Sequence, residues 1–107
     1  MLSDDCDIGD DLRRRLYRAF LDVFLLRLID EEPRWGYRLM EILRDRYGLR
    51  VGPPVLYPLL SSLERRGMVE GFDVHVGGRR RKVYQLTSRG RAYMRRFREV
   101  VREALDL

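Results

Sequence analysis

Two short segments of this 107-residue sequence carry side chains that bind anions rather than side chains that break bonds. Arg79-Arg80-Arg81-Lys82 sets four cations in succession, directly after Gly77-Gly78. Within residues 53–67, one side of a predicted helix carries small polar, aromatic or proline side chains and one arginine: Pro54, Tyr57, Pro58, Ser61, Ser62 and Arg65. Hydroxyls and arginines donate hydrogen bonds to phosphates and to base edges. These residue types therefore favour recognition of a polyanion.

Side chains for catalysis or metal binding are scarce. The sequence has one cysteine, Cys6, and one histidine, His75. A single cysteine forms no intrachain disulfide, which fits a reducing cytoplasm. One cysteine and one distant histidine do not make an ordinary zinc site, and no serine or cysteine motif accompanies His75 for a catalytic triad. We therefore expect no enzyme activity, no catalytic residues, no metal and no cofactor.

The charge is unevenly distributed along the chain. The sequence has 22 basic and 17 acidic residues, but five of the acids lie among the first eleven residues. Residues 12–107 therefore carry a net charge of +10, which suggests a polyanionic partner. All basic residues except Lys82 are arginines. The planar guanidinium of arginine donates paired hydrogen bonds to phosphates and to guanine edges. A general compositional bias explains the choice of arginine over lysine equally well, but it does not explain the clustering.

Length and hydropathy limit the architecture to one globular domain. Hydrophobic residues make up 45% and charged residues 36%, a composition typical of a folded, water-soluble protein. The longest apolar run, residues 23–26, stops at Arg27, well short of the roughly 18 residues that a membrane span needs. The start of the sequence lacks the pattern of a secretory signal. We expect a cytoplasmic protein that makes no use of a membrane.

The first half of the chain is predicted to contain two helices. Residues 1–9 resemble a disordered acidic tail, and a long helix is expected over residues 10–31. Because that helix is apolar on nearly every side from Ala19 to Ile29, we expect one side to meet the core and another to meet a second subunit. A second helix is expected over residues 35–47, ended by Gly48 and followed by a short extended segment at residues 49–51.

The second half predicts a helix, a hairpin and a last helix. Prolines in the first turn and a stripe of leucines predict a helix over residues 53–67. The stripe consists of Leu56, Leu59, Leu60 and Leu63. Pro58 lies inside this helix and marks a functional or closely packed place. Residues 68–76 and 83–86 form the predicted strands, joined at Gly77-Gly78 with the cations at the tip. Thr87 is predicted to cap a helix that runs to about Leu105.

This order of elements predicts a mainly α (α+β) fold, a winged helix-turn-helix. It combines a three-helix core with a β-wing of two to three strands and a C-terminal dimerisation helix. We assign residues 10–87 to the winged-helix DNA-binding domain and residues 88–107 to the dimerisation helix. The helix at about 53–67 would enter the major groove, which accommodates an α-helix. The wing at about 77–82 would contact the flanking backbone or minor groove.

Three stretches of residues 36–90 closely resemble the PadR family of transcriptional regulators. They are Gly36-Tyr37-Arg38-Leu39, then Leu56-Tyr57-Pro58-Leu59-Leu60 with residues 63–69, and finally residues 78–87 with Gly90. The resemblance implies a homodimer, usually a repressor, on a palindromic operator in double-stranded DNA. The sequence departs from the family at residues 52–55, where Gly-Pro-Pro-Val stands in place of Ser-Pro-Gly-Thr. A phosphate contact from a hydroxyl at position 55 is thereby placed in doubt.

The resemblance also implies three groups of site residues. Those expected at the DNA are Tyr37, Pro54, Val55, Tyr57, Pro58, Ser61, Ser62, Arg65, Arg79, Arg80, Arg81 and Lys82. Those expected between subunits are Leu16, Phe20, Phe24, Tyr93, Phe97, Val101 and Leu105. Some family members bind phenolic or multidrug-like compounds near that interface, so a small aromatic effector would contact Trp35, Phe20, Phe24 and Phe97. Plain core or interface packing of these aromatics is the alternative.

A second function class stays open on the sequence alone. A winged helix can serve as a protein-interaction scaffold whose exposed helix face binds a partner protein and whose wing cations are incidental. The response to salt separates the two functions, because six or more phosphate contacts give a log–log slope of affinity against salt near −5. The acidic segment could also compete with DNA for the basic face, and a solvated segment is the alternative.

Overall fold

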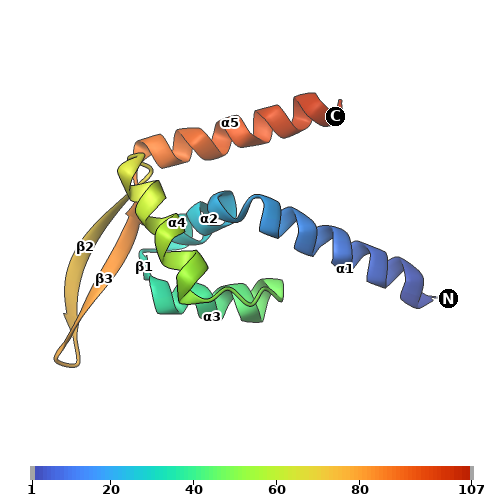
Figure 1. Ribbon diagram of the computed structural model, residues 1–107. Coiled ribbons are helices and arrows are strands. Elements are labelled where there is room, and N and C mark those ends of the chain that lie inside the picture. Colours follow the sequence, from blue (N-terminus) through green and yellow to red (C-terminus); the bar gives the residue numbers. More distant parts are fainter. Residues whose placement is uncertain (1, 107) are drawn as a thin grey trace.

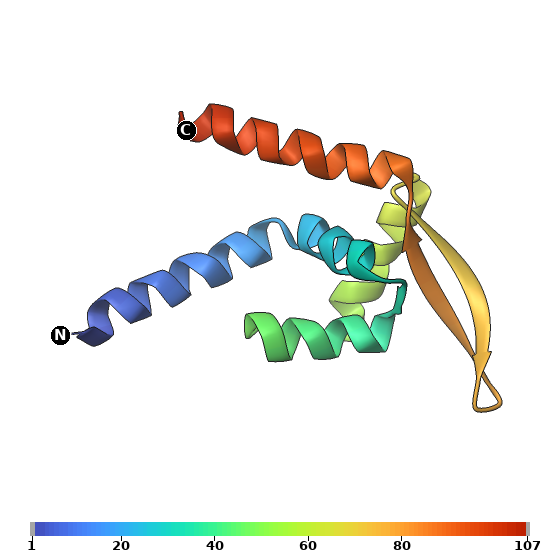
Figure 2. The same cartoon turned by 180° about the vertical axis from the view of Figure 1, so that it is seen from behind.

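The computed structural model, which describes residues 2–106, places five helices around a small antiparallel sheet of strand order β1-β3-β2 (Figure 1). The elements are α1 Leu2–Ala19, α2 Leu21–Glu31, β1 Arg34–Trp35, α3 Gly36–Tyr47, α4 Pro53–Arg65, β2 Val69–Val76, β3 Arg79–Leu86 and α5 Ser88–Leu105. Helices α1 and α5 both extend away from the body on the side opposite the wing formed by β2 and β3 (Figures 1 and 2). Within the described residues, no helix is both long and apolar enough to span a membrane.

The core lies among α2, α3 and α4, where leucines from each helix are completely buried. The predicted stripe on α4 supplies Leu56, Leu60 and Leu63, which are completely buried. Leu59 of the same stripe is half-buried. Leu25, Leu26 and Leu28 come from α2, and Leu39 and Leu43 come from α3. Leucines at helical spacing can bury one face of each helix, which leaves the opposite face of α4 to solvent. The predicted winged-helix fold is confirmed.

The first helix differs from its prediction at both ends. In place of one helix over residues 10–31, the structure has α1 and α2, separated at Phe20, whose φ and ψ are −121° and 41°. Backbone hydrogen bonds of 3.1 Å still span the break, from Phe20 N to Leu16 O and from Phe24 N to Phe20 O. The predicted disordered tail is also corrected, because α1 already begins at Leu2. Acidic residues near the positive end of a helix dipole favour such an extension.

The third strand of the sheet lies at a different place from the one predicted. Residues 49–51, which lie within the described part of the chain, do not form the predicted strand. Strand β1 is instead the pair Arg34–Trp35. Arg34 pairs with Tyr84 and Trp35 with Val83, both of β3. The guanidinium of Arg34 is buried, and its Nε donates to the Leu28 carbonyl oxygen at 2.8 Å. This contact anchors β1 to the end of α2.

The wing is longer than predicted, because β3 begins at Arg79 rather than at Val83. The four cations are thus part of the ladder with β2, and the tip is Gly77-Gly78, whose φ values are 57° and 77°. Positive φ at both positions is the geometry for which glycine is favoured in a tight hairpin. Since side chains alternate along a strand, Arg79 and Arg81 lie on one face of the wing and Arg80 and Lys82 on the other.

The start of α5 matches its prediction and is tied to the end of α4. The Thr87 hydroxyl accepts from Gly90 N at 3.0 Å and donates to the Gly67 carbonyl oxygen at 2.7 Å. Gly90 is buried, and a Cβ there would collide with the Met68 carbonyl oxygen and lie 2.7 Å from Leu86 Cδ1. The close approach of α5 to the sheet therefore depends on the missing side chain.

The Gly90→Ala substitution is expected to lower the free energy of unfolding by about 1 to 3 kcal/mol, the usual cost of overpacking. The matched control is Gly9→Ala in α1, where the nearest atom to a new Cβ is Nη2 of the flexible Arg13 side chain. That change should leave stability unchanged or raise it slightly, since alanine favours a helix over glycine. Chemical denaturation monitored by circular dichroism measures both. Equal unfolding midpoints for Gly90→Ala and the unmodified chain would contradict the expectation.

Candidate nucleic-acid interface

The outward face of α4 presents the polar groups that the sequence places there. Pro54, Val55, Pro58, Ser61 and Arg65 are exposed, and Ser62 is half-buried. The helix begins without a side-chain cap, and the amides of Val55 and Leu56 donate instead to the Gly52 carbonyl oxygen at 3.1 and 3.0 Å. The buried leucines hold this helix against the core, so Ser61 and Arg65 on the opposite side face solvent, whereas Ser62 is partly covered.

Tyr57 is held in place by a glycine at the start of α3. A Cβ at Gly36 would lie only 2.6 Å from Tyr57 Cε1, so the phenol ring packs directly over the backbone there. The ring is 42% exposed, and the neighbouring Tyr37 is 58% exposed. Glycine at position 36 is thus what allows the Tyr57 ring to approach the start of α3, where the exposed Tyr37 follows.

Glu64 connects α4 to both strands of the wing. Its Oε1 accepts from Lys82 Nζ at 2.8 Å, and its Oε2 accepts from Gly71 N at 3.2 Å. The hydrogen bond from Lys82 lowers the pKa of the Glu64 carboxyl, and the same bond raises the pKa of Lys82. Lys82, which we expected at the DNA, is therefore engaged in fixing the wing to α4. Sequence reasoning missed Glu64, which lies 18 residues from its partner.

The remaining wing cations fall into two environments. Arg79 and Arg80 are exposed at the outer end, where Arg80 Nε lies 3.7 Å from Asp73 Oδ2. Arg81 is half-buried, and its guanidinium carbon lies 4.7 Å from the centre of the Trp35 ring. A hollow of about 220 Å³, here termed the wing-base hollow, lies beside this pair and is lined by Trp35, Gly36, Tyr37, Tyr57, Arg80, Arg81, Lys82 and Tyr84.

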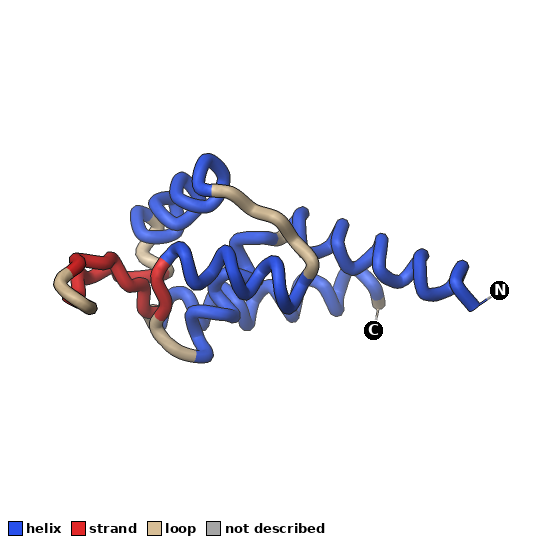
Figure 3. The backbone as a smooth tube through the Cα atoms, turned by 90° about the horizontal axis from the view of Figure 1, so that it is seen from below, coloured by secondary structure: helices blue, strands red, loops and turns tan. Residues whose placement is uncertain are grey.

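A second surface of interest is apolar and lies on the two helices that leave the body. Ile8, Leu12 and Leu16 of α1, and Phe20 at the break after it, recur at a spacing of four and are exposed. On α5, Val100 and Leu105 are exposed, whereas Tyr93, Phe97 and Val101 are half-buried. The rings of Phe20 and Phe97 meet edge to face at 4.9 Å. Figure 3 shows both helices extending in the same direction. The expectation for this surface omitted Ile8, because the predicted tail included it.

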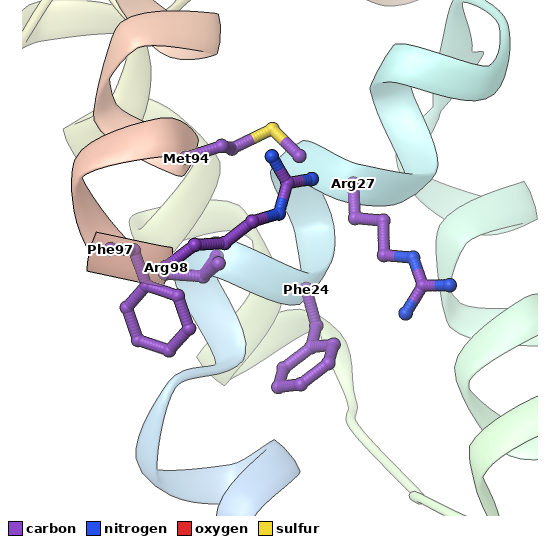
Figure 4. A pocket seen from close by; sticks show the side chains of 6 residues that line it. Phe24, Arg27, Met94, Phe97 and Arg98 are labelled. Atoms are coloured by element: carbon purple, nitrogen blue, oxygen red, sulfur yellow. The ribbon is translucent and has the colours of Figure 1, made fainter. Parts of the chain in front are cut away.

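The predicted effector pocket is only partly assembled. A pocket of about 340 Å³ lies between α2 and α5, where Phe24 and Phe97 contribute to its wall (Figure 4). Phe20 packs on Phe97, but Trp35 lies at the wing-base hollow, so its assignment to this pocket is wrong. Trp35 was grouped by residue type, whereas its position is set by β1. The remaining wall was not foreseen: Val23, Arg27, Met94 and Arg98.

A three-helix core, a helix with an exposed polar face and a basic β-wing define the class of winged-helix DNA-binding proteins. Residues 25–96 match the model of the transcriptional regulator PadR-like family, and the chain belongs to that family. A relative of Mycobacterium tuberculosis, transcriptional regulator Rv3488, is 35% identical over 97 residues, which span 86% of this chain and 89% of the relative.

Solved structures agree with this assignment. The crystal structure of a PadR family transcriptional regulator from Eggerthella lenta superposes with a TM-score of 0.77 at 28% identity, covering 99% of this chain and 92% of the other. A PadR-like transcriptional regulator from Bacillus cereus shares the fold, with a TM-score of 0.72 at 24% identity over 86% of this chain and 93% of its own. The family is one of transcriptional regulators, which implies regulation through binding of DNA.

Proposed function

We propose that this chain acts as a homodimeric, sequence-specific repressor that binds a pseudo-palindromic operator in double-stranded DNA. The observation that carries the proposal is that α4, with Ser61 and Arg65 exposed, is joined by the Lys82–Glu64 hydrogen bond to the wing that bears the exposed Arg79 and Arg80. A helix in the major groove can read base edges, while a basic wing next to it neutralises backbone phosphates. We assign DNA binding to residues 10–87 and dimerisation to residues 88–107. Helix α1 also takes part in the proposed dimer interface.

Within the proposed complex, the residues of α3 and α4 make two kinds of contact, with base edges and with backbone phosphates. Ser61 and Arg65 face the base edges, where hydroxyls and a guanidinium can distinguish base pairs. Tyr37 and Tyr57, at the start of α3 and α4, contact backbone phosphates and fix the orientation of the helix. Val55 brings no hydroxyl to this end of the helix, so packing rather than hydrogen bonding is expected there.

A homodimer is supported by the apolar surface of α1 and α5. Ile8, Leu12 and Leu16 leave about half of each side chain in solvent, although their spacing would form a continuous seam. Exposed apolar stripes of this kind mark surfaces for a partner. A two-fold axis through the seam would place two copies of α4 on half-sites about one helical turn, 34–36 Å, apart.

The proposal is tested by selecting bound duplexes from random DNA with the purified full-length protein. Enrichment of an inverted repeat with fixed half-site spacing is the expected result. Failure to enrich any sequence, together with an affinity that hardly responds to salt, would instead support the protein-interaction scaffold. Location in the cytoplasm is part of the same proposal, since a DNA-binding regulator must share a compartment with its operator.

The Ser61→Ala and Arg65→Gln substitutions are expected to change which operators are preferred. Loss of a base contact costs about 1–3 kcal/mol at the base pair concerned and little elsewhere. Arg79→Gln serves as the comparison, because a lost phosphate contact weakens all duplexes alike. Competition binding against single-base operator variants measures the pattern. A uniform loss across all variants for Ser61→Ala and Arg65→Gln would assign them to the backbone instead.

A small aromatic effector is a second element of the proposal. Phe24 and Phe97 on the wall of the α2–α5 pocket support it, because aromatic rings stack on flat ligands. A compound bound in this pocket would contact α5 and would thereby alter the spacing of the two subunits.

A further inference from the structure

We infer that the wing-base hollow seats a single phosphate of the DNA backbone, with Trp35 and Arg81 as its donors. The inference rests on the proposed DNA binding and adds to it a residue, Trp35, that the sequence does not suggest as a DNA contact.

The first observation is a pair of unsatisfied donors. Within residues 2–106, the buried side-chain nitrogens Trp35 Nε1 and Arg81 Nε have no hydrogen-bond partner. Leaving a buried donor unpaired is costly, more so for a charged group, and folded proteins rarely accept this cost without a reason. Both residues line the same hollow. Two such donors at one place indicate an acceptor supplied from outside the chain.

The second observation is that the two donors are rigidly held. Trp35 pairs with Val83 of β3, and Arg81 lies two residues along the same strand, with its guanidinium carbon 4.7 Å from the centre of the indole ring. A cation–π contact of this kind holds the guanidinium beside the indole, and a guanidinium has five N–H donors to offer to an oxygen. A donor pair held in this way loses little conformational freedom when an anion binds.

The third observation is the character of the lining. Three cations line the hollow: Arg81, Arg80, which lies 3.7 Å from Asp73, and Lys82, which donates to Glu64. Tyr37, Tyr57 and Tyr84 contribute three phenol rings. Cations combined with hydroxyl donors favour an oxyanion. The hollow also lies between the first turn of α4 and the wing, the two elements proposed to contact DNA. A nucleic-acid backbone that passes from one element to the other would cross the hollow, which favours a phosphate of DNA over a free anion.

Methylphosphonate scanning of the selected operator tests this inference. Each duplex carries one neutral linkage, and its affinity for the full-length protein is compared with that of the unmodified duplex. For the unmodified protein we expect one position per half-site at which neutralisation costs about 10-fold or more in affinity, as for a lost hydrogen bond to a charged group. The Trp35→Phe variant keeps an aromatic ring but lacks the donor, so it should lose affinity and most of its sensitivity at that position.

Two further variants keep the experiment decisive. Arg81→Lys retains the charge but lacks the planar fork, and it should lose the same sensitivity even if Trp35→Phe folds poorly. Arg79→Gln, outside the hollow, should weaken binding yet retain the full 10-fold effect at the identified linkage. Unfolding curves of all three confirm that the folded state is compared.

The outcomes separate this inference from the proposed function. Full sensitivity of Trp35→Phe and Arg81→Lys at every linkage would overturn the phosphate seat, although operator selection would still stand. Absence of any selected operator would instead overturn the proposed function.

Because Trp35 is the only tryptophan in the sequence, its fluorescence reports directly on the hollow. A response to inorganic phosphate as strong as the response to operator DNA would assign the hollow to a free anion and overturn the inference.

Discussion

Replacement of Leu12 and Leu16 by glutamate is expected to convert the proposed dimer into a monomer and to lower operator affinity by about 10²- to 10⁴-fold, the gain that linked binding sites provide. Both side chains are about half exposed in the single subunit, at 54% and 48%. The carboxylates therefore remain solvated in the monomer and do not disturb its fold. Across a seam between subunits, the same charges would be buried without partners, which is costly.

Sedimentation or light scattering measures the mass, and binding to operators with one or two half-sites measures the loss of linkage. A monomeric variant should bind both operators with similar affinity. The matched control is Arg14→Glu, an exposed position on the same helix, which should stay dimeric. A dimeric Leu12→Glu/Leu16→Glu variant would rule out α1 as part of the interface.

Replacement of Arg79, Arg80 and Arg81 by alanine should weaken binding to every duplex by about 100-fold or more, from the loss of hydrogen bonds between charged groups. Each lost phosphate contact also removes about 0.9 from the log–log slope of affinity against salt. Because the proposed dimer has two wings and loses three arginines from each, the slope should become shallower by roughly 5. Filter binding or fluorescence anisotropy over a range of salt concentrations measures both quantities.

The control for the wing variant removes arginines from α5 instead. Arg95→Ala/Arg102→Ala lowers the net charge at exposed positions away from the wing and should leave the slope unchanged. Because Arg81 packs on Trp35, the unfolding midpoint of the wing variant is measured alongside. An unaltered salt slope in a folded wing variant would remove these three arginines from the DNA contact surface.

Elements whose identity depends on neighbouring residues were predictable from the sequence. The leucine spacing of α4, the glycines at the wing tip and the Thr87 cap all act within a few residues, and the structure has each of them. The class of site followed from the same patterns, since the hydroxyl side of α4 lies opposite its leucines and therefore faces solvent.

Features that depend on distant contacts were not predictable in this way. Strand β1 has only two residues and exists because β3, about 50 positions further along the chain, provides its partner. The break at Phe20 has neither proline nor glycine, and apolar residues continue on both sides of it. The link from Glu64 to Lys82 and the stacking of Arg81 on Trp35 likewise join residues that periodicity does not relate. Burial and pairing partners, rather than residue type, decide the role of each cation in the wing.

Helix α1 is attached to its own subunit near its last turn, where Tyr17 meets Phe24 and Tyr47, each at 4.8 Å between ring centres. Of residues 8–16, all but Gly9 are exposed in the single subunit, and a helix with little tertiary support is only marginally stable in water. In the proposed dimer, the second subunit supplies that support, so folding of this segment is linked to association by mass action. The amount of ordered backbone per chain then rises with the abundance of the regulator, and a newly made copy acquires its complete shape only on meeting another.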